Sequence, residues 1–342
     1  MRMFKNVYGL DLGTYEIKIY DKRRDRIRRT KNVIAIQDEK EIFAIGNEAY
    51  TMYEKAPENI QVLFPMHNGV IARFDEMQYL LHAVLKREGM RLNGAEYVIA
   101  VPTDVTEVQK KAFYDLVCHS AARAKKVRIV ERAIADALGM GIDVFKAKGL
   151  FFANLGAETT ELSVLSRGGL IMSRLLPVGG RNLDDAVTAS VRHNKEFLIG
   201  RMTAEQLRCR SGVLGKANPK RLAAAGRDLT VGMPGTEAIS VGLIRAASRN
   251  FLSDIVREIE NMMDRTPPDI RREITKNGIY LTGGVAALQG LSEYLMECMG
   301  LPVTVDKNPQ LCTVNGLRAI ILDKYYRDLT YTMSDEDYRW LK

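Results

Sequence analysis

The chain has 342 residues, with 50 Lys and Arg against 42 Asp and Glu, so its formal charge is +8. This length suits two domains, or one large α/β unit split by a cleft. The 46% apolar and 27% charged residues are ordinary for a globular protein, which excludes disordered and fibrous classes. There is no apolar run of about 18 uncharged residues, no CxxC pair and no signal peptide, so we expect a reduced, cytoplasmic protein.

Short apolar segments alternate with helical patterns along the chain, which predicts an α/β fold with parallel strands. The apolar positions between Val241 and Met262 follow the spacing of one long helix, which Pro267 and Pro268 end. The charged and aromatic residues from Asp323 to Lys342 read as an appended helix or a loose end. The strands expected first are Val7–Leu10, Ile17–Tyr20, Tyr97–Val101 and Val127–Val130.

One internal repeat stands out. The segment Leu150–Leu165 has the same strand–turn–strand pattern as Val7–Tyr20, with equivalent turns at Asp11–Thr14 and Asn154–Gly156. A third glycine-containing turn lies within Leu281–Val285. Glycine lets backbone N–H groups approach a ligand closely, so the repeat predicts two duplicated domains whose turns bind a phosphate group.

An ordered set of motifs covers nearly the whole chain, from about Val7 to Ile321. The motifs are Gly9-Leu10-Asp11-Leu12-Gly13-Thr14, Pro65-Met66-His67-Asn68-Gly69-Val70-Ile71-Ala72, Val101-Pro102, Val178-Gly179-Gly180, Ile199-Gly200, Thr266-Pro267-Pro268 and Leu281-Thr282-Gly283-Gly284. Together they resemble the MreB branch of the actin-like ATPases, the bacterial rod-shape filament proteins. The resemblance implies a two-lobe α/β fold, with duplicated RNase H-like core subdomains around a nucleotide cleft.

The same resemblance implies the domain bounds. The first lobe is expected at residues 1–145, with a small subdomain at about 34–69 and completion by 310–325. The second lobe is expected at 146–308, with a small subdomain at about 183–239. Residues 326–342 remain as a C-terminal tail.

The resemblance also carries over a nucleotide site for ATP. The first phosphate turn, the second phosphate turn and a nucleoside-side turn are matched, together with positions near the base and ribose. Lys18 stands at a position that is basic in other actin-like proteins, and Asp11 would hold Mg²⁺ through water. The expected nucleotide-binding residues are Asp11, Gly13, Thr14, Lys18, Asn154, Gly156, Thr159, Thr160, Glu205, Arg208, Gly283 and Gly284.

Several of these positions have a simpler interpretation. An Asp-x-Gly-Thr turn such as that at Asp11 is common as a capped turn without a ligand. Glu205 and Arg208, three residues apart on a helix, could be a surface pair. The histidines and cysteines show no metal-ligand spacing.

The departures from the family pattern gather where the chemistry should occur. Asn154 replaces a carboxylate of the second turn, Ala157 crowds it, and Glu158 brings a negative charge that costs roughly 1–4 kcal/mol against a phosphate about 4 Å away. Arg181 replaces an Asp. Asn154 also weakens the case for Mg²⁺.

The catalytic position departs as well. The family segment Glu-Glu-Pro reads Glu131-Arg132-Ala133 here, and Arg132 cannot accept a proton from water. No catalytic residue is therefore identified, and the neighbouring Glu131 reads equally as a site residue or a solvated strand end. We expect ATP hydrolysis to be weak or lost, with Arg132 paired to Glu158.

Membrane contact has two candidate segments. Seven basic residues lie within Lys22–Lys31, which reads as a solvated hairpin or as a contact for anionic lipid or a protein partner. No aromatic residues are interleaved, so nucleic acid is not expected. In the loop Gly89–Gly94, Met90 and Leu92 are apolar as in the family's membrane loop, but Asn93 is polar.

The prediction is a cytoplasmic, MreB-like cytoskeletal protein of cell-shape control that binds ATP, with membrane association left open. Its partners would be copies of itself or other MreB-like subunits, and membrane-linked morphogenesis proteins. One alternative is an active ATPase filament of the same fold. Another is a non-polymerising actin-like adaptor that binds a membrane-linked partner.

Overall fold

The computed structural model describes residues 6–118, 124–212, 214 and 220–333. The chain divides into two compact units. The first unit comprises Met1–Ala147, Leu165–Leu175 and Leu311–Lys342, and the second comprises Lys148–Val164 and Leu176–Gln310. Within the described residues, two five-stranded sheets form the framework.

The first sheet has the strand order β10-β9-β1-β2-β3. Strands β1, β2 and β3 pair antiparallel, whereas β1, β9 and β10 pair parallel. The β1 sequence is buried on both faces, as expected of a central strand. The strands are β1 (Val7–Leu12), β2 (Glu16–Asp21), β3 (Arg26–Lys31), β9 (Glu96–Val101) and β10 (Lys126–Glu131).

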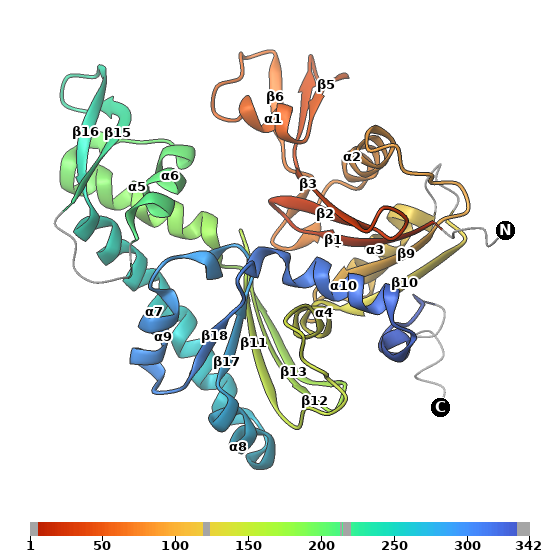
Figure 1. Cartoon of the computed structure of the whole chain (residues 1–342). Coiled ribbons are helices and arrows are strands. Elements are labelled where there is room, and N and C mark those ends of the chain that lie inside the picture. Colours follow the sequence, from red (N-terminus) through yellow and green to blue (C-terminus); the bar gives the residue numbers. More distant parts are fainter. Residues whose placement is uncertain (1–5, 119–123, 213, 215–219, 334–342) are drawn as a thin grey trace. The chain divides into compact units, whose positions relative to one another are not determined.

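Helices cover this first sheet and fill its core. Leu10, Ile17, Ile99 and Phe113 belong to one cluster of buried apolar side chains. Figure 1 shows α10 beside β1 and α4. The helices are α2 (Phe74–Arg87), α3 (Glu107–Cys118), α4 (Arg132–Gly139), α10 (Cys312–Leu322) and the 3₁₀ helix η3 (Lys324–Leu329).

The first unit also carries small sheets inserted between β3 and α2. One has the order β5-β4-β6 and packs around Val33, Ala35 and Ala49. The other pairs β7 with β8. The elements are β4 (Ile34–Gln37), β5 (Glu41–Ile45), α1 (Asn47–Thr51), β6 (Ile60–Leu63), β7 (Met66–His67) and β8 (Val70–Ile71).

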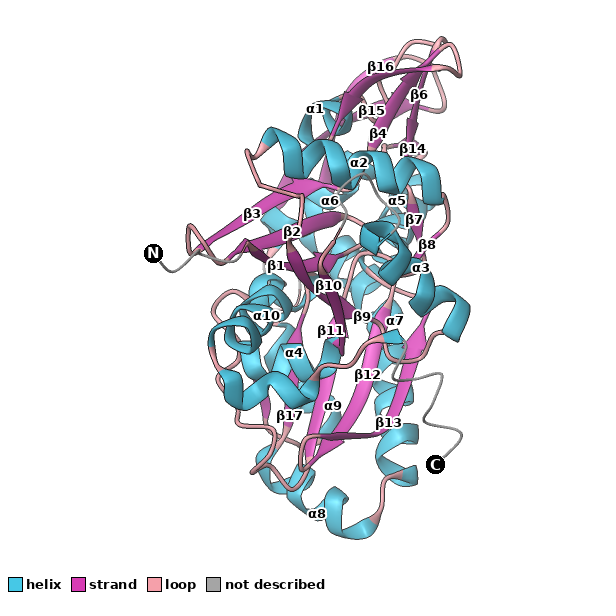
Figure 2. Cartoon of the chain, turned by 90° about the vertical axis from the view of Figure 1, so that its right-hand side faces the viewer, coloured by secondary structure: helices cyan, strands magenta, loops and turns pink. Residues whose placement is uncertain are grey.

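The second large sheet has the order β13-β12-β11-β17-β18, and Figure 2 shows β11, β12 and β13 running side by side. Strands β11, β17 and β18 pair parallel. Read in reverse, this order matches that of the first sheet element by element. The strands are β11 (Leu150–Leu155), β12 (Thr160–Ser166), β13 (Gly169–Leu176), β17 (Ile279–Thr282) and β18 (Val303–Val305).

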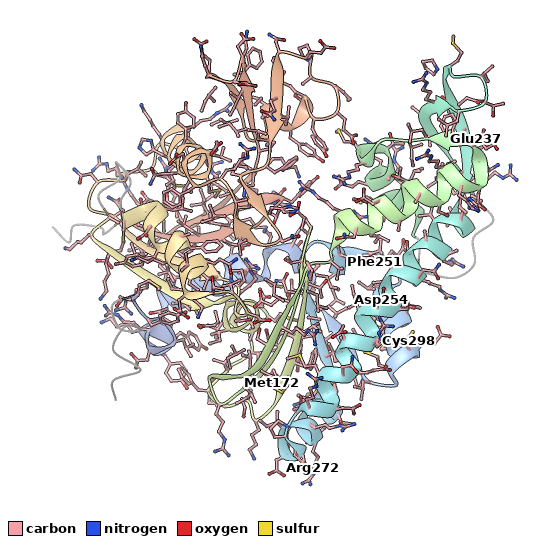
Figure 3. All side chains as sticks on the ribbon, turned by 180° about the vertical axis from the view of Figure 1, so that it is seen from behind. Met172, Glu237, Phe251, Asp254, Arg272 and Cys298 are labelled. Carbon is pink, nitrogen blue, oxygen red and sulfur yellow. The ribbon has the colours of Figure 1, made fainter. Side chains whose placement is uncertain are left out.

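The longest helix of the second unit is α7, which begins at the cap Ser240, whose hydroxyl accepts from Leu243 N. In Figure 3, Phe251 and Asp254 mark neighbouring turns of α7, and Cys298 lies on the adjacent α9. The helices are α5 (Gly180–Lys195), α6 (Arg201–Ser211), α7 (Val241–Arg265), α8 (Pro268–Asn277), α9 (Leu291–Met299), η1 (Val285–Ala287) and, at the boundary, η2 (Pro309–Leu311).

A small sheet of order β14-β15-β16 completes the second unit, and its strands are β14 (Phe197–Leu198), β15 (Arg221–Asp228) and β16 (Pro234–Ser240). The structure confirms the α/β class, the repeated strand–turn–strand unit and the long helix after Val241. It differs from the expectation of parallel strands, because β1, β2 and β3 form an antiparallel meander. None of the helices in the described residues has the length and apolarity to cross a membrane.

Candidate functional site

The first turn, Asp11–Thr14, lies at the end of β1. Gly13 N donates to Glu16 O at 3.0 Å, which closes the hairpin, and Gly13 O accepts from Asn32 Nδ2 at 2.9 Å. Asp11, Thr14 and Asn32 are buried. The sequence does not predict Asn32 in the site, and nothing in its local sequence marks it, because it follows β3, two strands further along the chain.

The antiparallel register of β1 and β2 places Asp11 directly opposite Lys18. Lys18 Nζ donates to Asp11 Oδ2 at 2.9 Å, and their side chains are 12% and 5% exposed. Both residues are expected in the site from the sequence, and the structure brings them together. The carboxylate of the first turn therefore already has a cation within hydrogen-bonding distance.

The second turn, Asn154–Thr160, repeats this backbone geometry. Gly156 N donates to Thr159 O at 2.8 Å, and Gly156 O accepts from Gly180 N at 3.0 Å. Thr159 is buried, and so is Thr160, whose hydroxyl donates to Val178 O. The first residues of α5 thus close over the second turn.

Glu158 in the second turn forms an ion pair with Arg181, the second residue of α5. The backbone adds to this link, because Arg181 N donates to Ala157 O at 2.7 Å. The sequence predicts Arg132 as the partner of Glu158, and the structure supplies Arg181. A contact of Glu158 with Arg132 would join the two units and stays a prediction.

The third turn, Thr282–Gly284, meets the second at the ends of two parallel strands. The register pairs Asn154 with Thr282. Gly283 has φ +87°, and a Cβ there would lie 2.4 Å from Leu155 O and 2.8 Å from Asn154 Oδ1. At Gly284 an added Cβ would meet no atom within 4 Å. The structure therefore assembles Asn154, Gly156 and Gly283 at one edge of the second sheet.

Arg208 of α6 binds Asp184 of α5 through two nitrogens of its guanidinium, with Nε donating to Oδ1 at 2.7 Å and Nη2 to Oδ2 at 3.3 Å. Both side chains are buried. Burial raises the pKa of Asp184 to about 6, and Arg208 opposes this rise while the charge of Glu205 adds to it. The partly buried Glu205 thus acts through its charge on a buried Asp184–Arg208 pair, and because Arg208 is buried its surface-pair interpretation is wrong.

Glu131 ends β10, and the buried Arg132 begins α4. The Tyr331 hydroxyl donates to Glu131 Oε1 at 3.0 Å, and the Tyr331 backbone pairs in both directions with Ile129. This end of the chain therefore extends the first sheet beyond β10. The short helix η3 precedes this pairing, so the chain up to Met333 is not a loose end, and residues 334–342 lie outside the described part.

Sequence reasoning missed this added segment, although a signal existed. Leu329, Tyr331 and Met333 alternate with polar residues and are all buried. That period of two is typical of a strand with one face on a core.

In both segments considered for membrane contact, some side chains bind or pack against the protein itself, while others are exposed. Met90 is buried, and Leu92 packs partly buried against the core of the first unit. In the basic segment, Arg24 donates to Glu88 O and Gly89 O, and Arg28 pairs with Glu88 at 2.7 Å. Two further members of that segment, Arg29 and Lys31, pair with Glu16.

The donor set of these turns is a poor match for Mg²⁺. The Asp11 carboxylate holds Lys18, the Glu158 carboxylate holds Arg181, and position 154 offers a neutral amide. Mg²⁺ prefers anionic oxygen ligands in octahedral geometry. No cluster of three or more His, Cys, Asp or Glu side chains suited to a metal ion occurs in the part of the chain that the structure describes.

Comparison with known proteins shows which family has this sequence and architecture. The family model described as MreB/Mbl protein matches residues 5–328. The chain belongs to the MreB/Mbl family. Among its relatives, the cell shape-determining protein MreB of Escherichia coli is 31% identical over 326 residues, covering 92% of each chain. The cell shape-determining protein Mbl of Bacillus subtilis is 29% identical over 325 residues, covering 94% of this chain and 97% of Mbl.

Solved structures agree with this family membership. MreB5 of Spiroplasma citri bound to AMPPNP superposes with a TM-score of 0.90 at 28% identity, covering 95% of this chain and 99% of that one. The MamK double helical filament gives a TM-score of 0.78 at 18% identity, covering 93% and 99%, and supports the fold alone. The predicted resemblance to MreB and the actin-like fold are confirmed. The matched family segment ends at Asp328, so Tyr331 lies beyond it.

Proposed function

We propose that this MreB-family protein is a cytoskeletal protein of cell-shape control that binds ATP, associates with copies of itself and hydrolyses ATP weakly or not at all. The observation that carries the proposal is the pair of repeated glycine turns in a chain of this family. Its relatives are named as cell shape-determining proteins.

Nucleotide binding is supported by the turns and by two neighbours. MreB5 of Spiroplasma citri was solved with AMPPNP and with ADP. In this chain the first turn would contribute Gly13 and Thr14, and the second Gly156 and Thr159. The Glu205 and Arg208 cluster with Asp184 is the part of the chain proposed to meet the nucleoside. Titration of the purified chain with AMPPNP in a calorimeter tests binding, and absence of heat with either AMPPNP or ADP would contradict the proposal.

Weak hydrolysis is inferred from the start of α4. Arg132 stands there in place of a carboxylate that could accept a proton from water, and the adjacent Glu131 accepts from Tyr331. Phosphate release from ATP should therefore stay near the blank, and Arg132→Glu should raise it. Steady release that Arg132→Glu does not increase would favour the active ATPase filament instead.

Self-association is tested by electron microscopy with ATP and with AMPPNP. Filaments support the cytoskeletal proposal. A monomer that binds nucleotide and pellets with a membrane-linked morphogenesis protein would favour the adaptor. Sedimentation with vesicles that contain or lack anionic lipid separates direct membrane association from association through such a partner.

A further inference from the structure

We propose that this chain binds its nucleotide without Mg²⁺, and that the Arg181 guanidinium supplies the positive charge at the second turn. The inference rests on the proposed nucleotide binding. The negative charges of a nucleoside triphosphate must be balanced by cations. The structure places basic side chains beside the carboxylates that a metal ion would otherwise use.

The first step is the state of the acidic side chains. Asp11 is bound by Lys18 at 2.9 Å, Glu158 by Arg181, and Asp184 by Arg208. Each of these three carboxylates thus faces a cation from its own unit. A divalent ion would have to displace or share these cations, at the cost of charge-assisted hydrogen bonds in largely buried positions.

The second step is the chemistry of position 154. In the first turn Asp11 is anionic, whereas Asn154 at the equivalent place is neutral. The Asn154 side-chain oxygen also lies close to Gly283, since a Cβ on Gly283 would come within 2.8 Å of it. Within the turn Asn154–Thr160 the one charged side chain is therefore Glu158, and it is paired with Arg181 of α5 rather than available to a metal.

The third step is which group of α5 can reach a phosphate. The backbone N–H groups of Gly180 and Arg181 donate to Gly156 O and Ala157 O. These two N–H groups at the start of α5 are therefore already hydrogen-bonded to the turn. The Arg181 side chain is 19% exposed, whereas the Glu158 side chain is 6% exposed. Arg181 is thus the more accessible member of the pair.

A guanidinium suits this role better than an ammonium. It carries five N–H donors in a planar fork, so Nη1 can keep Glu158 while other donors of the fork turn to a phosphate. Glu158 acts here as a positioning residue, because it holds the fork beside the turn. The two departures from the family pattern, an added acid at 158 and an added base at 181, compensate one another.

The test is calorimetric titration of the full chain with AMPPNP in excess EDTA and, separately, in excess Mg²⁺. The dissociation constants should agree within about threefold. Arg181→Gln should weaken binding in EDTA by about 10- to 100-fold, the worth of a charge-assisted contact. Arg181→Lys keeps the charge and should recover part of the affinity. The matched control is Arg272→Gln, at an exposed position of α8 labelled in Figure 3, and this variant should bind as the parent does.

Two further variants change the acidic charge of the second turn and leave Arg181 in place. Glu158→Gln should bind AMPPNP as tightly as the parent or more tightly, because it removes an anion near the phosphates. Asn154→Asp should make binding stronger in Mg²⁺ than in EDTA. Thermal unfolding of each variant shows whether it is folded, and Arg181→Lys carries the test if Arg181→Gln is not.

The outcomes are distinct. Binding that needs Mg²⁺ overturns this inference and leaves the proposed function standing. Equal binding by Arg181→Gln and the parent in EDTA overturns the role of Arg181. No binding in either condition overturns the proposed nucleotide site itself.

Discussion

The two hairpin turns have the same backbone hydrogen bond, but each is supported from outside by a different hydrogen bond, its brace. In each, the glycine N–H donates to the carbonyl three residues on, Gly13 to Glu16 and Gly156 to Thr159. In the first turn the glycine carbonyl accepts a hydrogen bond from the side chain of Asn32, which lies after β3. In the second turn it accepts from the backbone N–H of Gly180 in α5. A side-chain brace can be lost by one substitution, whereas a backbone brace depends on how closely two segments approach.

The turns also differ in how their charges are balanced. Asp11 and Lys18 face one another across two paired strands, so strand register alone brings them together. Glu158 and Arg181 belong to a turn and a helix, and their contact needs the packing of α5 on the second turn. One chain thus reaches a similar local charge by two routes.

The largest expected effect tests a feature that the second sheet has and the first lacks. β17 is followed by Gly283, whereas its counterpart β9 is followed by Pro102. Gly283→Ala should lower the free energy of unfolding by more than about 3 kcal/mol, because the new Cβ would lie 2.4 Å from Leu155 O at a positive φ. Denaturant unfolding measures this. Gly284→Ala is the control, with open space around its Cβ, and an equal loss in both variants would contradict the argument.

The equivalence of the two turns is tested next. An added Cβ would lie 2.9 Å from Glu16 O at Gly13 and 2.9 Å from Thr159 O at Gly156. Gly13→Ala and Gly156→Ala should therefore each cost about 1–3 kcal/mol of unfolding free energy, with similar values. Chemical denaturation of both variants gives the comparison. A difference well above about 1 kcal/mol would show that the hydrogen bonds to the glycine carbonyls, rather than the turns themselves, determine how well an added Cβ is tolerated.

The side-chain brace can be removed by itself. Asn32→Ala should destabilise the first unit by about 1–3 kcal/mol, because the partly buried Gly13 O is left without its donor. Hydrogen exchange should then speed up at β1 and β2 and stay unchanged at β11 and β12. Asn59→Ala, at an exposed position of the same unit, should change neither. Faster exchange in both hairpins would mean that the turns are not braced independently.

A smaller effect is expected at the edge of the first sheet. Tyr331→Phe removes the hydrogen bond to Glu131 and keeps the ring, so it should cost about 0.5–1.5 kcal/mol. Exchange of the Ile129 amide, which donates to Tyr331 O, reports loosening of the added segment. The exposed Tyr325 provides the control as Tyr325→Phe. No change at Ile129 would mean that the backbone pairing holds without the hydroxyl.

The smallest effect concerns the loop between β2 and β3, away from both turns. Hydrogen bonds from Arg318 and Tyr20 lower the pKa of Asp25 to about 2. This carboxyl titrates near pH 4 when unfolded, so the pair stabilises the fold above pH 4, and that contribution is lost as the pH falls from 4 to 2. Arg318→Ala should return the Asp25 titration toward pH 4, as followed by NMR. An unshifted titration in that variant would contradict the assignment.

Much of the framework follows from the sequence. Leu10 and Ile17 read as strand residues because apolar runs have a local period, and Gly13, Gly156 and Gly283 mark turns because few other residues tolerate such close approach. The family motifs are also local and ordered along the chain. The candidate site residues of the turns could therefore be predicted from the sequence alone.

The polar partners of those residues could not be read in the same way. Hydrophobic period and glycine turns are short-range signals, whereas Asn32 with Gly13, Arg181 with Glu158, and Tyr331 with Glu131 are joined by folding across 19, 23 and 200 residues. Many basic side chains could satisfy a given acid on charge alone. Only the packing of α5 on its turn, and of the chain end on β10, selects which one lies within hydrogen-bonding distance. Short-range patterns thus define the turns and the family, whereas the packing of distant segments selects the charged groups that the turns bind.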